Sequence, residues 1–496
     1  MLPTLLHLRR LRGLVILCLL VCGVSQPRRA DAQAPAEAGA RRPNVLFIAV
    51  DDLRPELGCY GRTHIHSPNI DRLAASGMVF ERAYVQQAVC APSRASLLTG
   101  LRPDTTGILD LNTPLRKAMP KVVSLPQAFR EAGYTSIGLG KIYHHPQDDM
   151  NVGWSREPWR PVGGQWLAPD NLALIERRKE ASNAESKGRV RGPAYEAGDV
   201  PDDAYGDGQV AARAIDALRG FEASGEPFFL AVGFFKPHLP FNCPKRYWDL
   251  YDRDAIALAP NPQRPKNVPE QAHTTWGELR SYAGIPAQGS LDDDTARTLI
   301  HGYYACVSYT DAQVGRLLDA LDTLQLTDNT IVILWGDHGW HLGDHDQWTK
   351  HTNFEKATHA PLILRAPGQR TGQRTAALVE FVDVYPTLCE LAGVPMPENL
   401  EGTSVVPLLS DPGRPWKTGA FSQYPRGKGV MGRSLRTDRY RYTRWTDAQG
   451  TLLGHELYDH QVDPQEDHNL AADASHAATA AELAAQLEAG WRAARP

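Results

Sequence analysis

The sequence predicts an α/β protein with a mainly parallel central sheet flanked by helices, followed by a smaller C-terminal α+β part with an antiparallel sheet. Nearly continuous apolar runs recur along the chain, and such runs are typical of strands buried on both faces of a parallel sheet. Segments with helical periodicity separate these runs, and this alternation indicates an α/β domain. Short strands and one helix then close the sequence.

Four predicted strands end in polar or ionisable residues. They span 44–50, 135–140, 228–233 and 331–335, and they lead into Asp51 and Asp52, into Lys141 and His144, into Lys236 and His238, and into Asp337 and His338. Predicted helices at 125–132, 210–221 and 303–324 lie between them. Ligands of parallel sheets bind beyond the carboxyl ends of the strands, so we expect these polar side chains to gather at one edge.

The segment 411–415, which contains Pro and Gly, is the predicted boundary between a first domain at 43–412 and a C-terminal subdomain at 413–496. An apolar run at 360–364 and a helical pattern at 381–392 precede it, and short strands at 419–424, 430–437, 440–445 and 456–459 and a helix at 478–494 follow it. Residues 154–207 are rich in Pro, Gly and charge. They are interpreted either as a solvated surface insertion or as a rim that shapes a substrate pocket.

The N-terminus has the pattern of a secretory signal peptide. Arg9, Arg10 and Arg12 precede an apolar run at 14–24, and Ala30-Asp31-Ala32 offers a small-x-small cleavage site. We expect a signal peptide at 1–32, a disordered linker at 33–42, and a secreted or periplasmic protein. A lipoprotein cysteine at Cys22 and an uncleaved anchor are the alternatives. The apolar run is short for a membrane span, so no stable membrane insertion is expected.

The net charge of the chain gives no indication of nucleic-acid binding. The chain has 496 residues, 42% of them hydrophobic and 22% charged, with a formal net charge of -4. Without an overall basic field, non-specific nucleic-acid binding is not expected. The seven cysteines are few for a secreted chain of this length. The sequence leaves undecided whether one or two disulfides form among Cys59, Cys243, Cys306 and Cys389.

Cys90 is predicted to begin a short helix, because Pro92 and Ser93 are typical of helix N-termini. The free backbone amides of such an end favour anions. Arg94 follows one helical turn later and can face the same place. The alternative for a cysteine in this position is a buried structural role.

The pattern Cys90-x-Pro92-Ser93-Arg94, followed by Leu98-Thr99-Gly100, resembles the signature of the type I sulfatases. The resemblance extends from about residue 43 to about residue 470, and it is strongest to the iduronate-2-sulfatase branch. It implies an alkaline-phosphatase-like fold with a catalytic first domain. It also implies that a formylglycine-generating enzyme converts Cys90 to Cα-formylglycine, whose hydrate is the nucleophile. The implied substrate is a sulfated polysaccharide or oligosaccharide with a 2-O-sulfated uronate.

Asp51, Asp52 and Asp337 indicate a metal site, because three carboxylates at one sheet edge need a cation. Oxygen ligands suit a hard ion, and Ca²⁺ is preferred over Mg²⁺ because it tolerates irregular geometry. The resemblance implies one Ca²⁺ and adds His338 and the modified Cys90 as ligands. For Asp51 and Asp52 alone, turn or cap chemistry is the alternative.

The loop 340–348 leaves a second metal interpretation open. It contains His341, Asp344, His345 and Asp346, which are residue types that bind Zn²⁺. We prefer the interpretation that these residues line the pocket or satisfy one another.

Sulfate-ester hydrolysis needs permanent cations and groups that exchange protons near neutrality. Arg94, Lys141 and Lys350 supply the cations, and His144 and His238 supply the proton-exchanging groups. The resemblance implies that Lys141 and Arg94 hold the hydrate and that His238, alone or with Lys350, protonates the leaving oxygen. It implies that His144 removes the second hydroxyl proton so that sulfate leaves. His145 is the rival of His144, and the Lys141-x-x-His144 spacing favours His144.

Two other functions are compatible with parts of the sequence. One is a phosphate or phosphonate monoester hydrolase of the same superfamily. Those members that use Ser or Thr normally employ two metals, whereas this chain offers a cysteine and ligands for one metal, which disfavours this function. An inactive protein that binds sulfated glycans would result if Cys90 stayed unmodified. The presence of Lys141, His144, His238 and Lys350 argues against that loss of activity.

Overall fold

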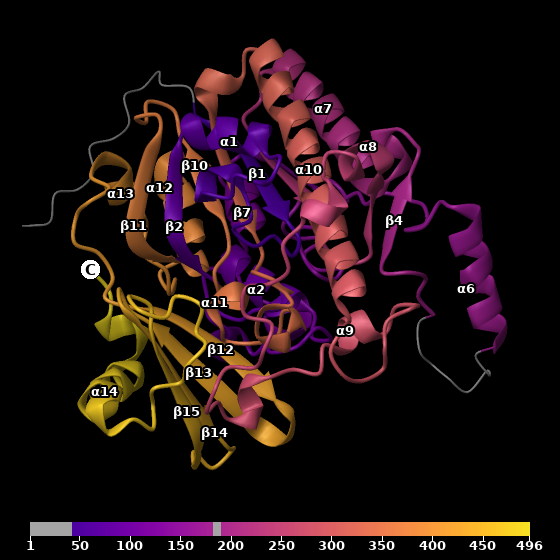
Figure 1. Cartoon of the computed structure of the whole chain (residues 1–496). Coiled ribbons are helices and arrows are strands. Elements are labelled where there is room, and N and C mark those ends of the chain that lie inside the picture. The colour runs from indigo at the N-terminus through magenta and orange to yellow at the C-terminus, as the bar shows by residue number, and fades with distance from the viewer. Residues whose placement is uncertain (1–41, 182–189) are drawn as a thin grey trace, which may run out of the picture. The chain divides into compact units, whose positions relative to one another are not determined.

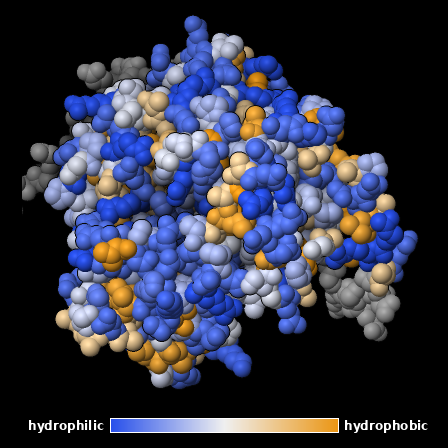
Figure 2. Space-filling view, viewed as in Figure 1, coloured by the Kyte–Doolittle hydropathy of each residue, from blue (hydrophilic) through white to orange (hydrophobic). Residues whose placement is uncertain are grey.

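The computed structural model describes residues 42–181 and 190–496, and the chain from Arg42 to Pro496 forms one compact unit. The predicted signal peptide at 1–32, and all but the last residue of the predicted linker at 33–42, lie outside the described residues and stay predictions. No helix within the described ranges is long and apolar enough to cross a membrane. Figure 2 shows a mainly hydrophilic face with hydrophobic side chains in small scattered groups.

The centre of the molecule is a seven-stranded sheet with the order β11-β2-β10-β7-β1-β5-β3. Its strands are β1 (Asn44–Val50), β2 (Met78–Tyr84), β3 (Thr135–Gly140), β5 (Phe228–Phe234), β7 (Thr330–Gly336), β10 (Leu362–Arg365) and β11 (Gln373–Glu380). The pairs β1–β5, β1–β7, β3–β5 and β2–β11 are parallel, and β10 runs antiparallel to both of its neighbours. The prediction of a mainly parallel sheet is confirmed.

β2 and β11 are not among the strands predicted from the sequence. Both strands carry charged side chains, Glu81 and Arg82 in β2 and Arg374 in β11, which interrupt the apolar pattern of a fully buried strand. β11 also lies at the edge of the sheet, where a strand is open on one side. Continuous hydrophobicity therefore identified β1, β3, β5 and β7, which lack charged side chains, and not β2 and β11.

Strand β1 contributes side chains to two hydrophobic cores, one on each face of the sheet. Leu46, Ile48 and Val50 pack with α1 (Pro68–Ala75), α7 (Gly206–Ser224) and α10 (Asp293–Thr323). Val45, Phe47 and Ala49 pack with α2 (Cys90–Thr99), α5 (Leu125–Glu131) and α12 (Val384–Ala392). Because both faces are covered, β1 is apolar along almost its whole length. Figure 1 shows α7 and α10 side by side.

Helix α10 begins at Asp293, earlier than the predicted start at residue 303. The Asp292 side chain caps this end by accepting a hydrogen bond from the backbone N–H of Thr295 (2.8 Å). The first turns of α10 are exposed or half-buried, so they lack the apolar stripe on which the prediction relied. The predicted helices at 125–132, 210–221 and 381–392 are confirmed as α5, α7 and α12.

The C-terminal part forms a four-stranded antiparallel sheet of β12 (Ala420–Arg426), β13 (Val430–Arg436), β14 (Tyr440–Thr446) and β15 (Leu452–Asp459). Helix α14 (Ala477–Ala493) covers one face, where Leu483 packs among Leu435, Tyr442 and Leu457. The predicted antiparallel sheet and closing helix are confirmed. The domain boundary between residues 412 and 413 stays a prediction.

Shorter elements fill the connections. They are α3 (Pro103–Thr106), α4 (Leu115–Ala118), α6 (Pro169–Ala181), α8 (Lys245–Trp248), α9 (Gly277–Arg280), α11 (Glu355–Thr358), α13 (Val406–Ser410), β4 (Tyr195–Gly198), β6 (Phe241–Pro244), β8 (His341–Leu342) and β9 (Trp348–Thr349). The cysteines of the described ranges, Cys59, Cys90, Cys243, Cys306 and Cys389, are all free thiols, so the disulfides that the sequence left open are not formed in this structure.

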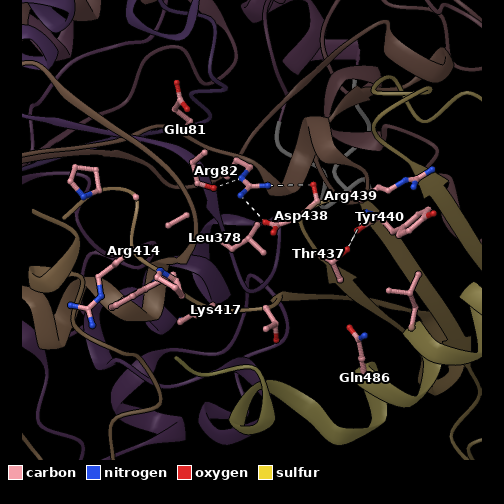
Figure 3. A pocket seen from close by; sticks show the side chains of 18 of the residues that line it. Glu81, Arg82, Leu378, Arg414, Lys417, Thr437, Asp438, Arg439, Tyr440 and Gln486 are labelled. Carbon is pink, nitrogen blue, oxygen red and sulfur yellow. Dashed lines mark hydrogen bonds and ion pairs between the residues drawn. The ribbon is translucent and has the colours of Figure 1, made fainter.

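A cavity of about 910 Å³ lies between the β2–β11 edge of the central sheet and the C-terminal part. Figure 3 shows Arg82 reaching Asp438 across it, with Nη2 and Oδ1 2.8 Å apart. Arg439 pairs in turn with Asp459. None of the predicted site residues lines this cavity. The cavity thus belongs to the junction of the two sheets and not to the predicted site.

A buried ionic cluster joins the same two sheets. Glu380, at the end of β11, accepts hydrogen bonds from Arg102 Nη1 and Nη2 (2.8 and 2.7 Å), from Lys417 Nζ (2.9 Å) and from the backbone N–H of Phe421 in β12 (2.9 Å). Burial alone would raise the pKa of Glu380, but Arg102 and Lys417 lower it to about 2. The carboxylate is therefore charged in the folded protein near neutrality.

The Glu380→Gln variant should be less stable than wild type by about 3 kcal/mol near neutral pH, because removing one member of a buried ionic cluster leaves charge uncompensated. The folded pKa of Glu380 lies below its ordinary value of 4.5. Its stabilising contribution is therefore complete above 4.5 and is lost as the pH falls toward 2. Urea unfolding at several pH values measures this: the difference between wild type and variant should narrow below 4.5.

The control for this prediction is Glu81→Gln, which breaks the exposed pair with Arg374. It should change the free energy of unfolding by less than about 1 kcal/mol. Equal stability of wild type and Glu380→Gln near neutral pH would contradict the assignment.

Candidate active site

The ends of β1 and β7 bring three buried carboxylates together. Asp51 and Asp52 follow β1, and Asp337 follows β7. The backbone N–H of Asp52 donates to Asp337 Oδ1 (2.8 Å). The expected gathering of polar strand ends at one edge of the sheet is therefore observed here.

Cys90 is the first residue of α2 and is buried, with Val89 as the N-cap. Its Sγ lies 3.4 Å from His338 Nε2, 3.7 Å from Lys141 Nζ and 3.9 Å from Asp52 Oδ1. Burial, and then the charge of Asp51, raise the pKa of the Cys90 thiol well above its ordinary value. An unmodified thiol here is thus held protonated, and a protonated thiol is a poor nucleophile.

Arg94 bridges two of the carboxylates that flank Cys90. Its Nε donates to Asp337 Oδ2 (2.8 Å) and its Nη2 to Asp51 Oδ1 (3.0 Å). Its Nη1 donates to the backbone carbonyls of Lys141 and, at 2.9 Å, of Ile142. The guanidinium thereby links the ends of β1, β3 and β7 to helix α2.

The loops after β3 and β5 approach each other without room for side chains. Gly140 has φ +73°, and a Cβ at this position would collide with the carbonyl of Gly233. A Cβ at Gly233 would collide with the backbone of Lys141. The backbone N–H of Lys141 donates to the Gly233 carbonyl (2.8 Å), which fixes the start of the loop that carries Lys141 and His144.

Lys141 and Lys350 each bind a carboxylate of the cluster. Lys141 Nζ donates to Asp51 Oδ2. Lys350 Nζ donates to Asp52 Oδ2 (2.9 Å) and lies 2.9 Å from Glu278 Oε2. Burial alone would lower the pKa of Lys350, but Asp52 and Glu278 hold it well above its ordinary value. All three predicted cations, Arg94, Lys141 and Lys350, therefore lie in the cluster.

All five predicted metal ligands lie in two overlapping groups whose candidate ligand atoms are within 4.8 Å of one another. The groups are Asp51, Asp52, Cys90 and His238, and Asp52, Cys90, Asp337 and His338. His338 Nδ1 lies 2.9 Å from the Gly339 carbonyl, so the proton is placed on Nδ1 and Nε2 faces Asp52 (3.2 Å). A buried, carboxylate-rich donor set of this kind fits a hard divalent cation. His238, which was not a predicted ligand, joins the first group.

His144 has a buried Nδ1 without a hydrogen-bond partner in the described structure. Burial, and then the charge of Lys141, lower the pKa of His144 to about 3, so the ring is neutral near neutral pH. The rival residue His145 lies under the influence of Asp110 and Asp148 instead. The charges of Lys141 and Asp51 act on His144, which places it nearer to the cluster.

Glu278, in α9, is a site residue that the sequence analysis missed. Its Oε1 lies 3.1 Å from His238 Nε2, and its Oε2 contacts Lys350. His238 Nδ1 lies 2.6 Å from the Leu239 carbonyl, so the ring is held between the two oxygens. Burial alone would raise the pKa of Glu278, but Lys350 and His238 hold it well below its ordinary value. A single acidic residue outside every motif and strand end gave no signal in the sequence.

The zinc alternative is not supported. Within the described ranges, His341, Asp344, His345 and Asp346 do not form a group with converging ligand atoms. His341 Nε2 lies 2.9 Å from Thr352 Oγ1, His345 Nε2 lies 2.7 Å from the Gln465 carbonyl, and Asp344 pairs with Arg54 at 3.0 Å. These residues make structural bonds around the loop.

A hydrolase of anionic esters is the class that this arrangement suits, because fixed cations surround a buried reaction centre. A sulfatase family model matches residues 43–394, and a model of the N-sulphoglucosamine sulphohydrolase C-terminal region matches residues 343–492. Iduronate 2-sulfatase of Homo sapiens is 36% identical, with 93% of this chain and 96% of that protein covered.

Two solved structures are similar over most of their length. A 2-O GAG sulfatase is 26% identical with a TM-score of 0.67, and 90% of this chain and 91% of that chain are covered. The phosphonate monoester hydrolase of Agrobacterium radiobacter is 26% identical with a TM-score of 0.73, and 91% and 96% are covered. The chain belongs to the sulfatase family and is a sulfuric ester hydrolase with an alkaline-phosphatase-like fold.

Replacing Glu278 by Gln should lower kcat/KM for sulfate-ester hydrolysis by about 10- to 100-fold, because Lys350 and His238 lose a charged hydrogen-bond partner. Steady-state kinetics on one sulfate ester measure the effect. Glu270→Gln, at a side chain that is 91% exposed in the same connecting region, is the matched control and should leave kcat/KM unchanged. An unaltered kcat/KM in Glu278→Gln would show that the contacts of Glu278 do not influence the reaction.

Proposed function

We propose that this sulfatase hydrolyses the sulfate ester of a 2-O-sulfated uronate in a sulfated oligosaccharide or polysaccharide. The proposal is carried by one observation: Cys90 lies at the start of a helix, inside a buried cluster of carboxylates and cations at the strand ends. The substrate assignment is supported by the extent of the similarity to iduronate 2-sulfatase and by the similarity to a 2-O GAG sulfatase.

The proposed nucleophile is the hydrate of Cα-formylglycine at position 90, which a formylglycine-generating enzyme would produce from Cys90. The raised pKa of the Cys90 thiol supports this proposal, since a protonated thiol is unsuited to direct attack. Lys141, within 3.7 Å of Sγ, and the carboxylate-bridging Arg94 would hold the modified side chain.

The proposed metal is one Ca²⁺, held by Asp51, Asp52, Asp337, His338 and the modified residue 90. When bound, it would polarise the sulfate oxygens as a Lewis acid. Mg²⁺ is the less suitable ion, because it demands near-ideal octahedral geometry.

The two histidines would move the protons. His238, held between Glu278 and the Leu239 carbonyl, would give a proton to the leaving sugar oxygen, with Lys350 beside it. His144 would take the proton of the second hydroxyl of residue 90. Its pKa of about 3 keeps the ring neutral near neutral pH, and its unpartnered Nδ1 leaves a nitrogen available for that proton.

A phosphonate monoester hydrolase is the second candidate function, favoured by the similarity to the enzyme of that activity. An unmodified, inactive glycan-binding protein is the third. We further propose that the chain is secreted or periplasmic, on the signal-like pattern at 1–32.

Wild type co-produced with a formylglycine-generating enzyme should release sulfate from a heparin-derived disaccharide that carries only a 2-O-sulfated uronate. Cys90→Ala should release none. Cys90→Ser should accept one sulfate group without turnover, because serine lacks the second hydroxyl needed to expel it. Ion chromatography of sulfate and mass spectrometry of the protein measure these outcomes. Hydrolysis of a phosphonate monoester in preference to the disaccharide would favour the second function.

Removing divalent metal with a chelator should abolish sulfate release and lower the thermal unfolding temperature, since the carboxylate cluster loses its cation. Ca²⁺ should restore both properties at lower concentration than Mg²⁺. The Asp52→Asn variant should lose the Ca²⁺-dependent rise in unfolding temperature. A chelated enzyme with full activity would refute the metal assignment.

A further inference from the structure

Arg160 lies beside the active site, on the 154–207 segment that the sequence left open as surface insertion or pocket rim. Trp159 forms a parallel bridge with Leu139 of β3. Its backbone N–H donates to the Gly138 carbonyl (3.0 Å), and its carbonyl accepts from the Gly140 N–H (2.8 Å). This pairing fixes Arg160 next to the loop that carries Lys141 and His144.

The guanidinium of Arg160 contacts that loop through its backbone. Nη2 donates to the Tyr143 carbonyl (2.8 Å) and contacts the His144 carbonyl at 3.4 Å. Across residues 42–181 and 190–496, no carboxylate lies within 4.0 Å of the Arg160 guanidinium. Only one of its nitrogens is thus engaged by the described protein.

The charge of Arg160 has no ion-pair partner among the described residues, although Asp51 and Asp148 act on it from a greater distance. Burial, and then the charge of Arg94, lower the pKa of Arg160 to about 10, although Asp51 acts in the opposite direction. The influence of Arg94 and Asp51 also places the guanidinium within electrostatic reach of the reaction centre. A partly buried cation without an anionic partner is unfavourable, and an anionic ligand would relieve this cost.

The cations in contact with the carboxylate cluster are already paired. Arg94 and Lys141 bind Asp51, and Lys350 binds Asp52 and Glu278. Lys236 Nζ, in the loop after β5, binds the backbone carbonyls of His238 (2.9 Å) and Pro240. Arg160, unlike these cations, retains donors for a substrate group, and a guanidinium matches the two oxygens of a carboxylate.

We propose that Arg160 binds the carboxylate of the uronate ring whose sulfate is hydrolysed, and thereby selects acidic over neutral sulfated sugars. This inference rests on the proposed function, because a uronate carries its carboxylate on the same ring as the 2-O-sulfate. Arg160 is a specificity residue in this assignment and takes no part in proton transfer.

The test compares Arg160→Gln and Arg160→Lys with wild type on three substrates: the 2-O-sulfated uronate disaccharide, its carboxyl-reduced counterpart and an aryl sulfate without a carboxylate. For the uronate disaccharide, KM should rise by about 10- to 100-fold in Arg160→Gln. The rise should be smaller in Arg160→Lys, which keeps the charge without the planar fork. For the other two substrates, KM and kcat should stay within about twofold of wild type.

Arg156→Gln, at an exposed arginine of the same segment, is the matched control and should behave as wild type on all three substrates. Equal losses on all three substrates would overturn the inference, because they would mean that Arg160 only supports the His144 loop. Unchanged kinetics on the uronate disaccharide would overturn it as well. If the proposed function is wrong, the result is different: wild type itself would hydrolyse the aryl sulfate and not the uronate disaccharide. The assignment of Arg160 to the uronate carboxylate would then be wrong as well.

Discussion

The bridge that Arg94 makes between Asp51 and Asp337 is the interaction on which the active site depends. The two carboxylates come from adjacent parallel strands, and without a cation between them their burial would be strongly unfavourable. The same guanidinium holds the loop after β3 through two backbone carbonyls. Since Arg94 belongs to the helix that Cys90 begins, one side chain sets the position of residue 90 relative to three strand ends.

β1, β3, β5 and β7 and the residues that follow them could be predicted because burial leaves a nearly continuous apolar run in the sequence. β1 is an unbroken apolar run because its alternate side chains are buried in two different cores, one on each face of the sheet. β2 and β11 carry charged side chains and give no such pattern. The start of α10 was missed because its first turns are partly exposed and depend on the cap at Asp292.

Site residues that come soon after a predicted strand could be predicted from the sequence. A site residue from a segment distant in the sequence could not. Asp51, Lys141 and Asp337 directly follow strands, and His238 lies in the loop after β5. Glu278 reaches Lys350 and His238 from α9, and a contact between separate segments has no signature in one sequence. The resemblance to sulfatases implied the roles of the two histidines, and the structure shows their surroundings. His144 has a nitrogen without a hydrogen-bond partner, and His238 is held between two oxygens.

The close approach of Gly140 and Gly233 has a consequence for how this enzyme can change over evolution. Neither position has room for a side chain, so these two glycines cannot be replaced without moving the loops that carry the site residues. The 154–207 segment, by contrast, contacts β3 through the Leu139–Trp159 bridge and the Ser136–Ser155 hydrogen bonds, and its other described residues lie outside the central sheet. A preference for a different sugar can therefore arise by substitutions in the 154–207 segment, while the residues at the strand ends stay the same.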